Sequence, residues 1–375
     1  MAVPVFFADY RSNGPKRNTL AKLGKLLDAA GLSGIVRTGD LTAIKIHFGE
    51  LGNDAFVSPV QARRIADAVR ALGAKPFFAD TNTLYSGSRS NAADHLATAH
   101  AHGFVPEVCG APVLIADGLR GSDWREVELD GTWFKRAKIA SAFLDADSFV
   151  AISHFKGHEM AGFGGAIKNI AMGCAPPAGK REQHAVKFFV VEAKCTACGT
   201  CVEVCPVGAI SLEGAALSGG RRAALIDRTK CIGCGECASR CPVKAISMDW
   251  KTEIVPFTEK MTEYAHAAVK GKEGRRLFVT FVKDVVPDCD CAPWSDAPMV
   301  ADLGILASVD PVAIDQAAYD LVTAAPPSAG SLVDGKAAAG QDKFAAIHPE
   351  TRGLVQLEHG ERIGLGSREY ELVRV

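Results

Sequence analysis

The chain has 375 residues, 48% hydrophobic and 23% charged, a composition that excludes disordered and collagen-like proteins. Its 42 basic and 43 acidic residues leave a net charge of −1, which disfavours nucleic-acid binding through bulk charge. The N-terminus lacks the basic segment of a signal peptide, and no uncharged apolar run reaches the ~18 residues that suggest a membrane span. We therefore expect a cytoplasmic protein with reduced thiols that binds neither membrane nor nucleic acid.

Strand-like and helical patterns alternate outside a cysteine-rich middle segment. The strand-like apolar runs lie at about residues 3–8, 42–48, 75–79, 112–116, 148–153 and 277–283. One helix is predicted from Ser58, an N-cap followed by Pro59, to Gly73, and another begins at Asp310. This alternation predicts an α/β domain with a mostly parallel sheet that is covered on both faces.

Polar side chains follow several of these runs, at the carboxyl ends of the strands, where ligands gather in parallel sheets. Lysines there would attract an anionic cofactor or substrate. A histidine, with an ordinary pKa of about 6.5, would carry the proton that accompanies electron transfer. The alternative for each position is a solvated loop residue. The residues expected to be catalytic in this crevice are Lys45, His47, His154, Lys156 and His158.

A glycine-rich turn at residues 161–170 follows His158 and opens a predicted helix. Backbone N–H groups at such a helix start can hold a phosphate or carboxylate. The dinucleotide-binding pattern fails because Ile167 stands where its third glycine is needed, and a Walker A pattern fails as well. Ordinary glycine-rich packing is the alternative. The residues expected to bind a cofactor are Asp80, Gly162, Gly164, Gly165, Lys168 and Asn169.

The cysteine-rich middle of the chain is an internal repeat. Residues 194–211 and 230–247 are identical at 11 of 18 positions, and each copy contains Cys-x2-Cys-x2-Cys-x3-Cys-Pro. Three thiolates at this spacing can surround one face of an iron–sulfur cube, while the fourth points to the cube of the other copy. A zinc ribbon would leave the third and fourth cysteines without a role. We therefore expect two [4Fe–4S] clusters, one held by Cys195, Cys198, Cys201 and Cys241 and the other by Cys205, Cys231, Cys234 and Cys237.

This repeat makes residues 190–250 resemble a bacterial-type ferredoxin with two [4Fe–4S] clusters. The segment has six acidic and seven basic residues, so charge would not steer it to many partners, and we expect it to dock on its own chain. The interpretation is an inserted ferredoxin-like α+β domain at residues 188–250. This insert divides a discontinuous α/β domain into residues 1–187 and 251–375.

Cys289 and Cys291 form a Cys-x-Cys pair flanked by two aspartates. Together with other ligands the pair could hold a third metal ion, such as zinc or iron. A redox-active pair and a structural pair are the alternatives. The candidate partners of the pair are Cys174, His154, His158 and His184.

Four segments outside the repeat carry a second resemblance. They are Lys-Ile-His-Phe-Gly-Glu at 45–50, Ser-His-Phe-Lys-Gly-His at 153–158, Gly-Gly-Ala-Ile-Lys-Asn at 164–169 and Ser-Val-Asp-Pro-Val-Ala-Ile-Asp at 308–315. These segments resemble the family known as domain of unknown function 362, whose members often carry an inserted ferredoxin. The resemblance implies an α/β fold and a redox role, without an established substrate.

We therefore expect an iron–sulfur oxidoreductase in which the clusters relay electrons to or from a ligand in the crevice. A flavin or deazaflavin would suit, because it exchanges single electrons with clusters and hydride with a substrate. The alternative is a non-catalytic electron carrier or an accessory protein for metal or cluster assembly. Either protein would work with a redox partner protein or a small redox substrate, and the sequence indicates no particular oligomeric state.

Overall fold

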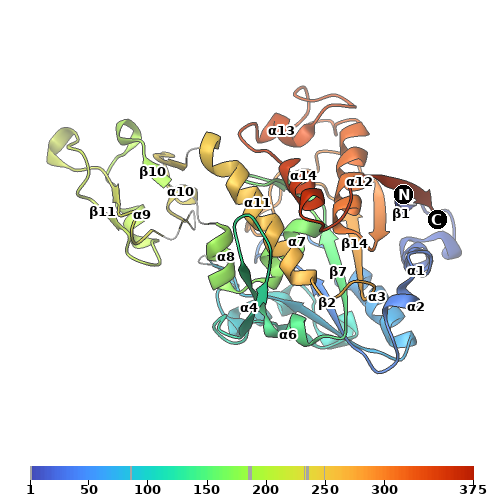
Figure 1. Ribbon diagram of the computed structural model, residues 1–375. Coiled ribbons are helices and arrows are strands. Elements are labelled where there is room, and N and C mark those ends of the chain that lie inside the picture. The colour runs from blue at the N-terminus through green and yellow to red at the C-terminus, as the bar shows by residue number, and fades with distance from the viewer. Residues whose placement is uncertain (1, 85–86, 185–187, 232, 234–235, 249) are drawn as a thin grey trace.

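The computed structural model describes residues 2–84, 87–184, 188–231, 233, 236–248 and 250–375 (Figure 1). An eight-stranded sheet forms its centre. Five of the seven pairs of neighbouring strands are parallel, and only β15 runs antiparallel to its two neighbours. The predicted α/β fold with a mostly parallel sheet is therefore confirmed. The strands, in spatial order, are β16 (Tyr370–Arg374), β1 (Val3–Asp9), β15 (Gly304–Ser308), β14 (Arg276–Val282), β7 (Ser148–His154), β2 (Leu41–Ile46), β3 (Lys75–Asp80) and β4 (Val113–Ile115).

Each of the six strand-like runs in the sequence forms a strand of this sheet. Every residue of β7 is buried, as expected for a parallel strand that is covered on both faces. The sequence did not predict β15 and β16. β15 is a short and mostly apolar run, which periodicity cannot distinguish from a buried piece of helix. β16 is a short strand at the edge of the sheet in which Glu371 and Arg374 interrupt the apolar residues.

Helices cover both faces of the sheet and close two apolar cores. On one face α1 and α3 pack over Ile44, Phe78 and Val279, and on the other α7, α11 and α12 pack over Phe149 and Phe278. In the described part of the chain, no helix combines the length and the apolar character needed to cross a membrane. The helices are α1 (Thr19–Ala29), α2 (Leu32–Ile35), α3 (Pro59–Ala71), α4 (Ala92–Ala101), α5 (Pro106–Cys109), α6 (Ser141–Asp145), α7 (Ala166–Cys174), α8 (Pro177–Gln183), α11 (Trp250–Val269), α12 (Pro311–Ala324), α13 (Lys343–Ile347) and α14 (Val355–Arg362).

The two predicted helices begin at the capping residues that the sequence indicates. The Ser58 hydroxyl accepts a hydrogen bond from the Val60 N–H at 3.2 Å at the start of α3. The Asp310 carboxylate accepts from the N–H groups of Val312 and Ala313 at 2.8 and 2.9 Å at the start of α12. In both cases a side chain satisfies backbone donors that have no partner inside the helix, so local chemistry sets the start.

The cysteine-rich segment extends to one side of the α/β body (Figure 1). Its first and last strands pair antiparallel, so the chain enters and leaves the segment side by side. The sequence repeat has an offset of 36 residues, and the pairing of Val190 with Ile246 is matched by that of Ile226 with Ile210. The segment therefore has approximate twofold symmetry. Its elements are β10 (Phe188–Val190), α9 (Thr200–Glu203), β11 (Ile210–Ser211), β12 (Leu225–Ile226), α10 (Glu236–Ser239) and β13 (Ile246–Met248).

Candidate functional site

Charged side chains at the carboxyl ends of β2 and β3 form a buried ion pair. Lys45 Nζ lies 3.1 Å from Asp80 Oδ1, and it also donates to Asn169 Oδ1 of α7 at 2.7 Å. Gly173 of α7 makes room for this lysine, because a Cβ at that position would collide with its side chain. Burial alone would raise the pKa of Asp80, but the charge of Lys45 holds it well below its ordinary value. The ion pair therefore stays charged.

A second buried ion cluster joins β7 to the loop that follows β14. Asp290 Oδ1 lies 2.7 Å from His154 Nδ1, and Asp290 Oδ2 lies 3.1 Å from Lys156 Nζ. His154 Nε2 lies 2.7 and 3.0 Å from the backbone carbonyl oxygens of Lys283 and Asp284. Both ring nitrogens of His154 therefore face hydrogen-bond acceptors. His154 and Lys156 thus flank the Asp290 carboxylate.

His47 contacts an arginine that the sequence analysis did not select. Arg89 Nη1 lies 3.0 Å from His47 Nε2, and Arg89 Nε donates to Glu50 Oε2 at 3.0 Å. Arginine only donates, so His47 accepts this bond. Burial, and next the charge of Arg89, lower the pKa of His47 well below its ordinary value. His47 is therefore neutral near pH 7, and its lowered pKa makes it a weaker proton acceptor than an ordinary histidine. Arg89 lies between two serines in a loop, where no sequence pattern marks it.

The glycine-rich turn packs against its own chain. The Ala166 and Ile167 N–H groups at the start of α7 donate to the Asp315 carboxylate at 2.7 and 2.9 Å. A Cβ at Gly165 would collide with the same carboxylate. We expected the start of this helix to hold an external anion. The Asp315 carboxylate already occupies the N–H groups of its first turn. Burial raises the pKa of Asp315 to about 7.

The remaining glycines of the turn also serve close packing. Gly162 has a φ of 77°, and a Cβ there would lie 2.8 Å from the Cα of Gly353. A Cβ at Gly164 would lie 3.0 Å from Cδ of Lys168. Two short strands, β8 (Lys156–His158) and β9 (Gly162–Gly164), form the hairpin that brings the turn over the sheet. Ordinary glycine-rich packing, the alternative interpretation, therefore accounts for these positions.

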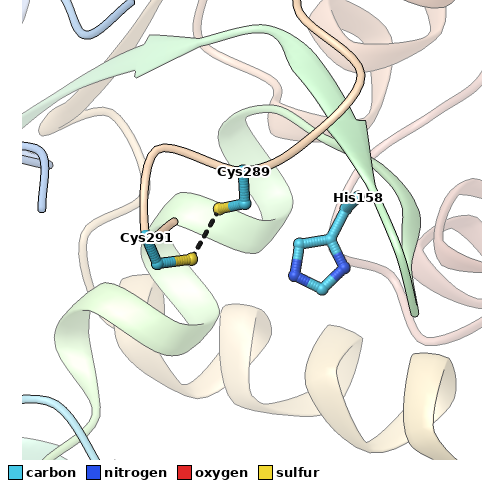
Figure 2. Close-up of side chains that lie close together, drawn as sticks. All are labelled: His158, Cys289 and Cys291. Carbon is cyan, nitrogen blue, oxygen red and sulfur yellow. Dashed lines mark hydrogen bonds between the residues drawn. The ribbon is translucent and has the colours of Figure 1, made fainter. Parts of the chain in front are cut away.

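His158, Cys289 and Cys291 form a compact group beside this hairpin (Figure 2). One nitrogen of the ring and the two sulfurs all lie within 4.8 Å of one another, close enough to reach a single metal ion. The two sulfurs are 2.7 Å apart, and Lys168 Nζ donates to Cys289 Sγ at 3.2 Å. Of the partners predicted for the cysteine pair, His158 belongs to this group in the described part of the chain. His154 binds Asp290 instead.

Four of the predicted cluster ligands surround one pocket in the cysteine-rich segment. Cys195, Cys198 and Cys201 from the first copy of the repeat line it together with Cys241 from the second copy. Cys201 and Cys241 are buried, whereas Cys198 is exposed. The residues around one pocket are therefore the set that the crossed pattern predicts.

The two copies of the repeat share backbone features that face their last cysteines. The Ala209 N–H donates to Cys205 Sγ at 3.2 Å, and the equivalent Ala245 N–H donates to Cys241 Sγ at 3.1 Å. Hydrogen bonds to sulfur are one of the means by which proteins tune iron–sulfur clusters. Cys231 and Cys237, predicted ligands of the other cluster, are partly exposed and buried, respectively. Cys234 and the domain boundary at residue 187 lie outside the described residues.

The interpretation of the strand-end residues as solvated loop positions is wrong. Lys45 is completely buried, and His154, Lys156 and His158 are at most 6% exposed. Ion pairs join most of these side chains to partners on other elements, so they form one polar core at the carboxyl edge of the sheet. Asp290 and Asp315 anchor this core in a way that the sequence did not predict, because their partners lie 136 and 149 residues away along the chain.

Solved structures resemble the chain only in part. One is the lactate racemase apoprotein from Thermoanaerobacterium thermosaccharolyticum, with 13% identity and a TM-score of 0.36 over 70% of this chain and 49% of that one. Another is a protein from Thermotoga maritima, with 10% identity and a TM-score of 0.34 over 78% of this chain and 57% of that one. The chain thus spans about half the length of these structures. No curated protein matches it. The family model described as "Domain of unknown function (DUF362)" matches residues 42–320, well over half of the chain, and the chain therefore belongs to this family.

Proposed function

We propose that residues 188–250 are a ferredoxin-like domain with two [4Fe–4S] clusters and that the protein is an iron–sulfur oxidoreductase. When bound, such clusters supply one-electron transfer. The α/β domain would hold the ligand that exchanges these electrons, an organic redox cofactor such as a flavin or deazaflavin, or a small redox substrate. The proposed ligands are Cys195, Cys198, Cys201 and Cys241 for one cluster and Cys205, Cys231, Cys234 and Cys237 for the other.

The pocket with cysteines from both copies of the repeat is the main support for this proposal. Cys241 belongs to the second copy, yet it lines the pocket of Cys195, Cys198 and Cys201. Two-cluster ferredoxins need this crossing of the fourth ligand. A zinc ribbon, built from two separate Cys-x2-Cys turns, does not need it. The repeated N–H to sulfur hydrogen bonds of Ala209 and Ala245 support the same interpretation.

Unpaired polar atoms in the core of the α/β domain support a polar ligand there. Asp80 Oδ2 and both ring nitrogens of His95 are buried without a hydrogen-bond partner among the described residues, and Asp80 Oδ2 and His95 Nε2 face each other at 3.8 Å, too far for a hydrogen bond. Such atoms are costly to bury, so a ligand or water that bonds to them would stabilise the core. Burial lowers the pKa of His95 to about 3, and the charges of Arg89, Lys180 and Lys45 act in the same direction, so positive charge around these atoms favours an anionic ligand. The competing candidate is an electron carrier without a ligand, and mass analysis of the anaerobically purified protein distinguishes the two.

Anaerobically purified protein is expected to contain about eight irons and eight acid-labile sulfides per chain, because eight thiolates can hold two cubes. Reduction with dithionite should bleach the broad visible absorption and produce the paramagnetic resonance of two interacting centres. Metal analysis, sulfide analysis and the two spectra check this prediction. Tightly bound zinc without labile sulfide would show that the repeat is a zinc site and would refute the proposal.

Deletion of residues 188–248 is expected to leave a folded α/β domain without clusters. Phe188 and Met248 are paired across β10 and β13, so a short linker can join the flanking chain, and the deletion stops before α11. We expect a lower melting temperature, because Phe188 and Ile246 belong to the apolar core that continues beneath α11. Circular dichroism and thermal unfolding check the result. A chain that no longer folds would show that the segment is part of the α/β core and not a separate domain.

A further inference from the structure

The Cys289–Cys291 pair is surrounded by hydrogen-bond donors. Lys168 Nζ donates to Cys289 Sγ at 3.2 Å, and the Cys291 thiol points at the same sulfur at 2.7 Å. In Figure 2 the ring nitrogen of His158 that lies farther from the backbone, Nε2, faces the two sulfurs. Cys289 is 4% exposed, so bulk water contributes little to the solvation of its sulfur. These surroundings suit a buried thiolate.

The hydrogen bonds of His158 favour a thiolate over a metal ion at this place. Its Nδ1 accepts from the N–H groups of Met160 and Ala161, both at 3.0 Å. A neutral imidazole has one N–H group, and here it must be on Nε2, which faces the two sulfurs (Figure 2) and lies 3.7 Å from Glu159 Oε2. A metal-binding histidine usually has the opposite arrangement, because its second nitrogen donates to a carbonyl or carboxylate. With its proton on Nε2, His158 has no lone pair on the side of the sulfurs that could bind a metal ion.

Asp290 fixes the position of the two cysteines on either side of it. His154 and Lys156 anchor the Asp290 carboxylate. The sulfur of the preceding residue, Cys289, contacts Lys168. The Asp290 carbonyl also accepts from the Glu50 N–H at 2.9 Å. The loop is thus fixed on both sides, and the two sulfurs are held within reach of each other.

We propose that Cys289 and Cys291 are a redox-active dithiol–disulfide pair and that this pair is the two-electron acceptor of the iron–sulfur protein. The inference rests on the proposed function for its electron donor. In the reductive direction the sulfur–sulfur bond breaks and takes up two electrons, one from each reduced cluster, and one proton. The products are the Cys289 thiolate beside Lys168 and the Cys291 thiol. In the oxidative direction the pair returns both electrons, Cys291 loses its proton and the bond forms again.

The charges around the pair support this assignment of the thiolate. The hydrogen bond from Cys291 lowers the pKa of the Cys289 thiol well below its ordinary value; burial opposes this shift, and the charges of Lys168 and Lys156 add to it. His184 interacts electrostatically with His158 and lies four residues before β10, the first strand of the cysteine-rich segment.

Electron counting on the full-length protein tests the inference. Anaerobically oxidised wild-type protein is expected to take up about four electrons per chain, two in the clusters and two in the disulfide. The Cys289→Ser/Cys291→Ser variant should take up about two, with unchanged iron content and cluster spectra. The matched control is Cys109→Ser, which removes a buried cysteine in α5 and should still take up about four. Equal uptake by wild type and the double variant would overturn the inference.

A second measurement needs no variant. Differential alkylation and mass spectrometry of the peptide with Cys289 and Cys291 should find a disulfide in the oxidised wild-type protein and two thiols after reduction. Free thiols in both the oxidised and the reduced protein would refute the redox-active pair. Stoichiometric zinc that the double variant loses would refute it as well. Iron and sulfide are measured in the same sample, so absent clusters would refute the proposed function separately. In a sample without clusters, reduction with a phosphine followed by alkylation would still show whether Cys289 and Cys291 form a disulfide.

Discussion

The Cys241→Ala variant is expected to lose the cluster that Cys195, Cys198 and Cys201 hold, and to keep the other. The fourth thiolate of the pocket comes from the second copy of the repeat, so its removal opens the cube of the first copy. Iron should fall from about eight to about four per chain, with a matching loss of labile sulfide. Metal analysis and the resonance spectrum of the reduced variant measure this effect, because one remaining cluster has no partner to interact with.

Double variants show which cysteines share a cluster. Cys195→Ala/Cys241→Ala should lose no more iron than either single variant, because both residues serve one cube. Cys231→Ala/Cys241→Ala should lose nearly all iron, because its two changes damage different cubes. The mirror variant, Cys205→Ala, should behave as Cys241→Ala does but remove the other cluster. If Cys231→Ala/Cys241→Ala retained four irons, each copy would hold its own cluster and the crossed ligation would be wrong.

Replacing Asp290 with alanine is expected to lower the free energy of unfolding by about 3–5 kcal/mol, since it leaves buried positive charge without a partner. Lys156 is 6% exposed and lies 3.1 Å from Asp290 Oδ2, and His154 shares the same carboxylate. Urea unfolding at pH 7 measures the loss. The matched control is Asp288→Ala, a partly exposed carboxylate in the same loop, whose loss should cost at most about 1 kcal/mol.

The effect of this substitution depends on pH in a defined direction. The charges of His154 and Lys156 outweigh burial and hold the pKa of Asp290 well below its ordinary value. A group with a lowered pKa in the folded state stabilises the protein above its unfolded pKa of about 4 and loses this contribution as the pH falls below that value. The difference in stability between wild type and Asp290→Ala should therefore be full at pH 7 and shrink below about pH 4. A difference that grows on acidification would refute this origin.

A compensating change separates charge from packing. Lys156→Met removes the buried cation that Asp290→Ala leaves unpaired, so the double variant should be more stable than Asp290→Ala alone. If the double variant loses the sum of the two single effects, the carboxylate does not act through Lys156. Equal stability of Asp290→Ala and Asp288→Ala would show that the ion cluster does not stabilise the fold.

The amino-acid sequence alone determined the features that depend on close neighbours in the chain. Ser58 and Asp310 cap the helices that follow them, because a capping side chain bonds to backbone donors two or three residues away. The six apolar runs form strands because burial on both faces requires continuous apolar sequence. The cysteine spacing predicted which four side chains line one pocket, because three come from one local turn and the repeat supplies the fourth, Cys241, from its second copy.

Only the tertiary structure decided how the polar residues of the α/β domain are used. The sequence predicted that Lys45 and Lys156 line a ligand crevice, but lysines are almost never fully buried without a partner. Their partners, Asp80 and Asp290, lie on other elements, and no periodicity connects residues that far apart in the chain. In the same way, Asp315 caps α7 from 149 residues away and takes the place that the sequence assigned to an external anion. Ion pairs of this kind form only when the sheet and its crossover helices bring distant segments to the same edge. For this reason the order of residues along the chain does not predict them.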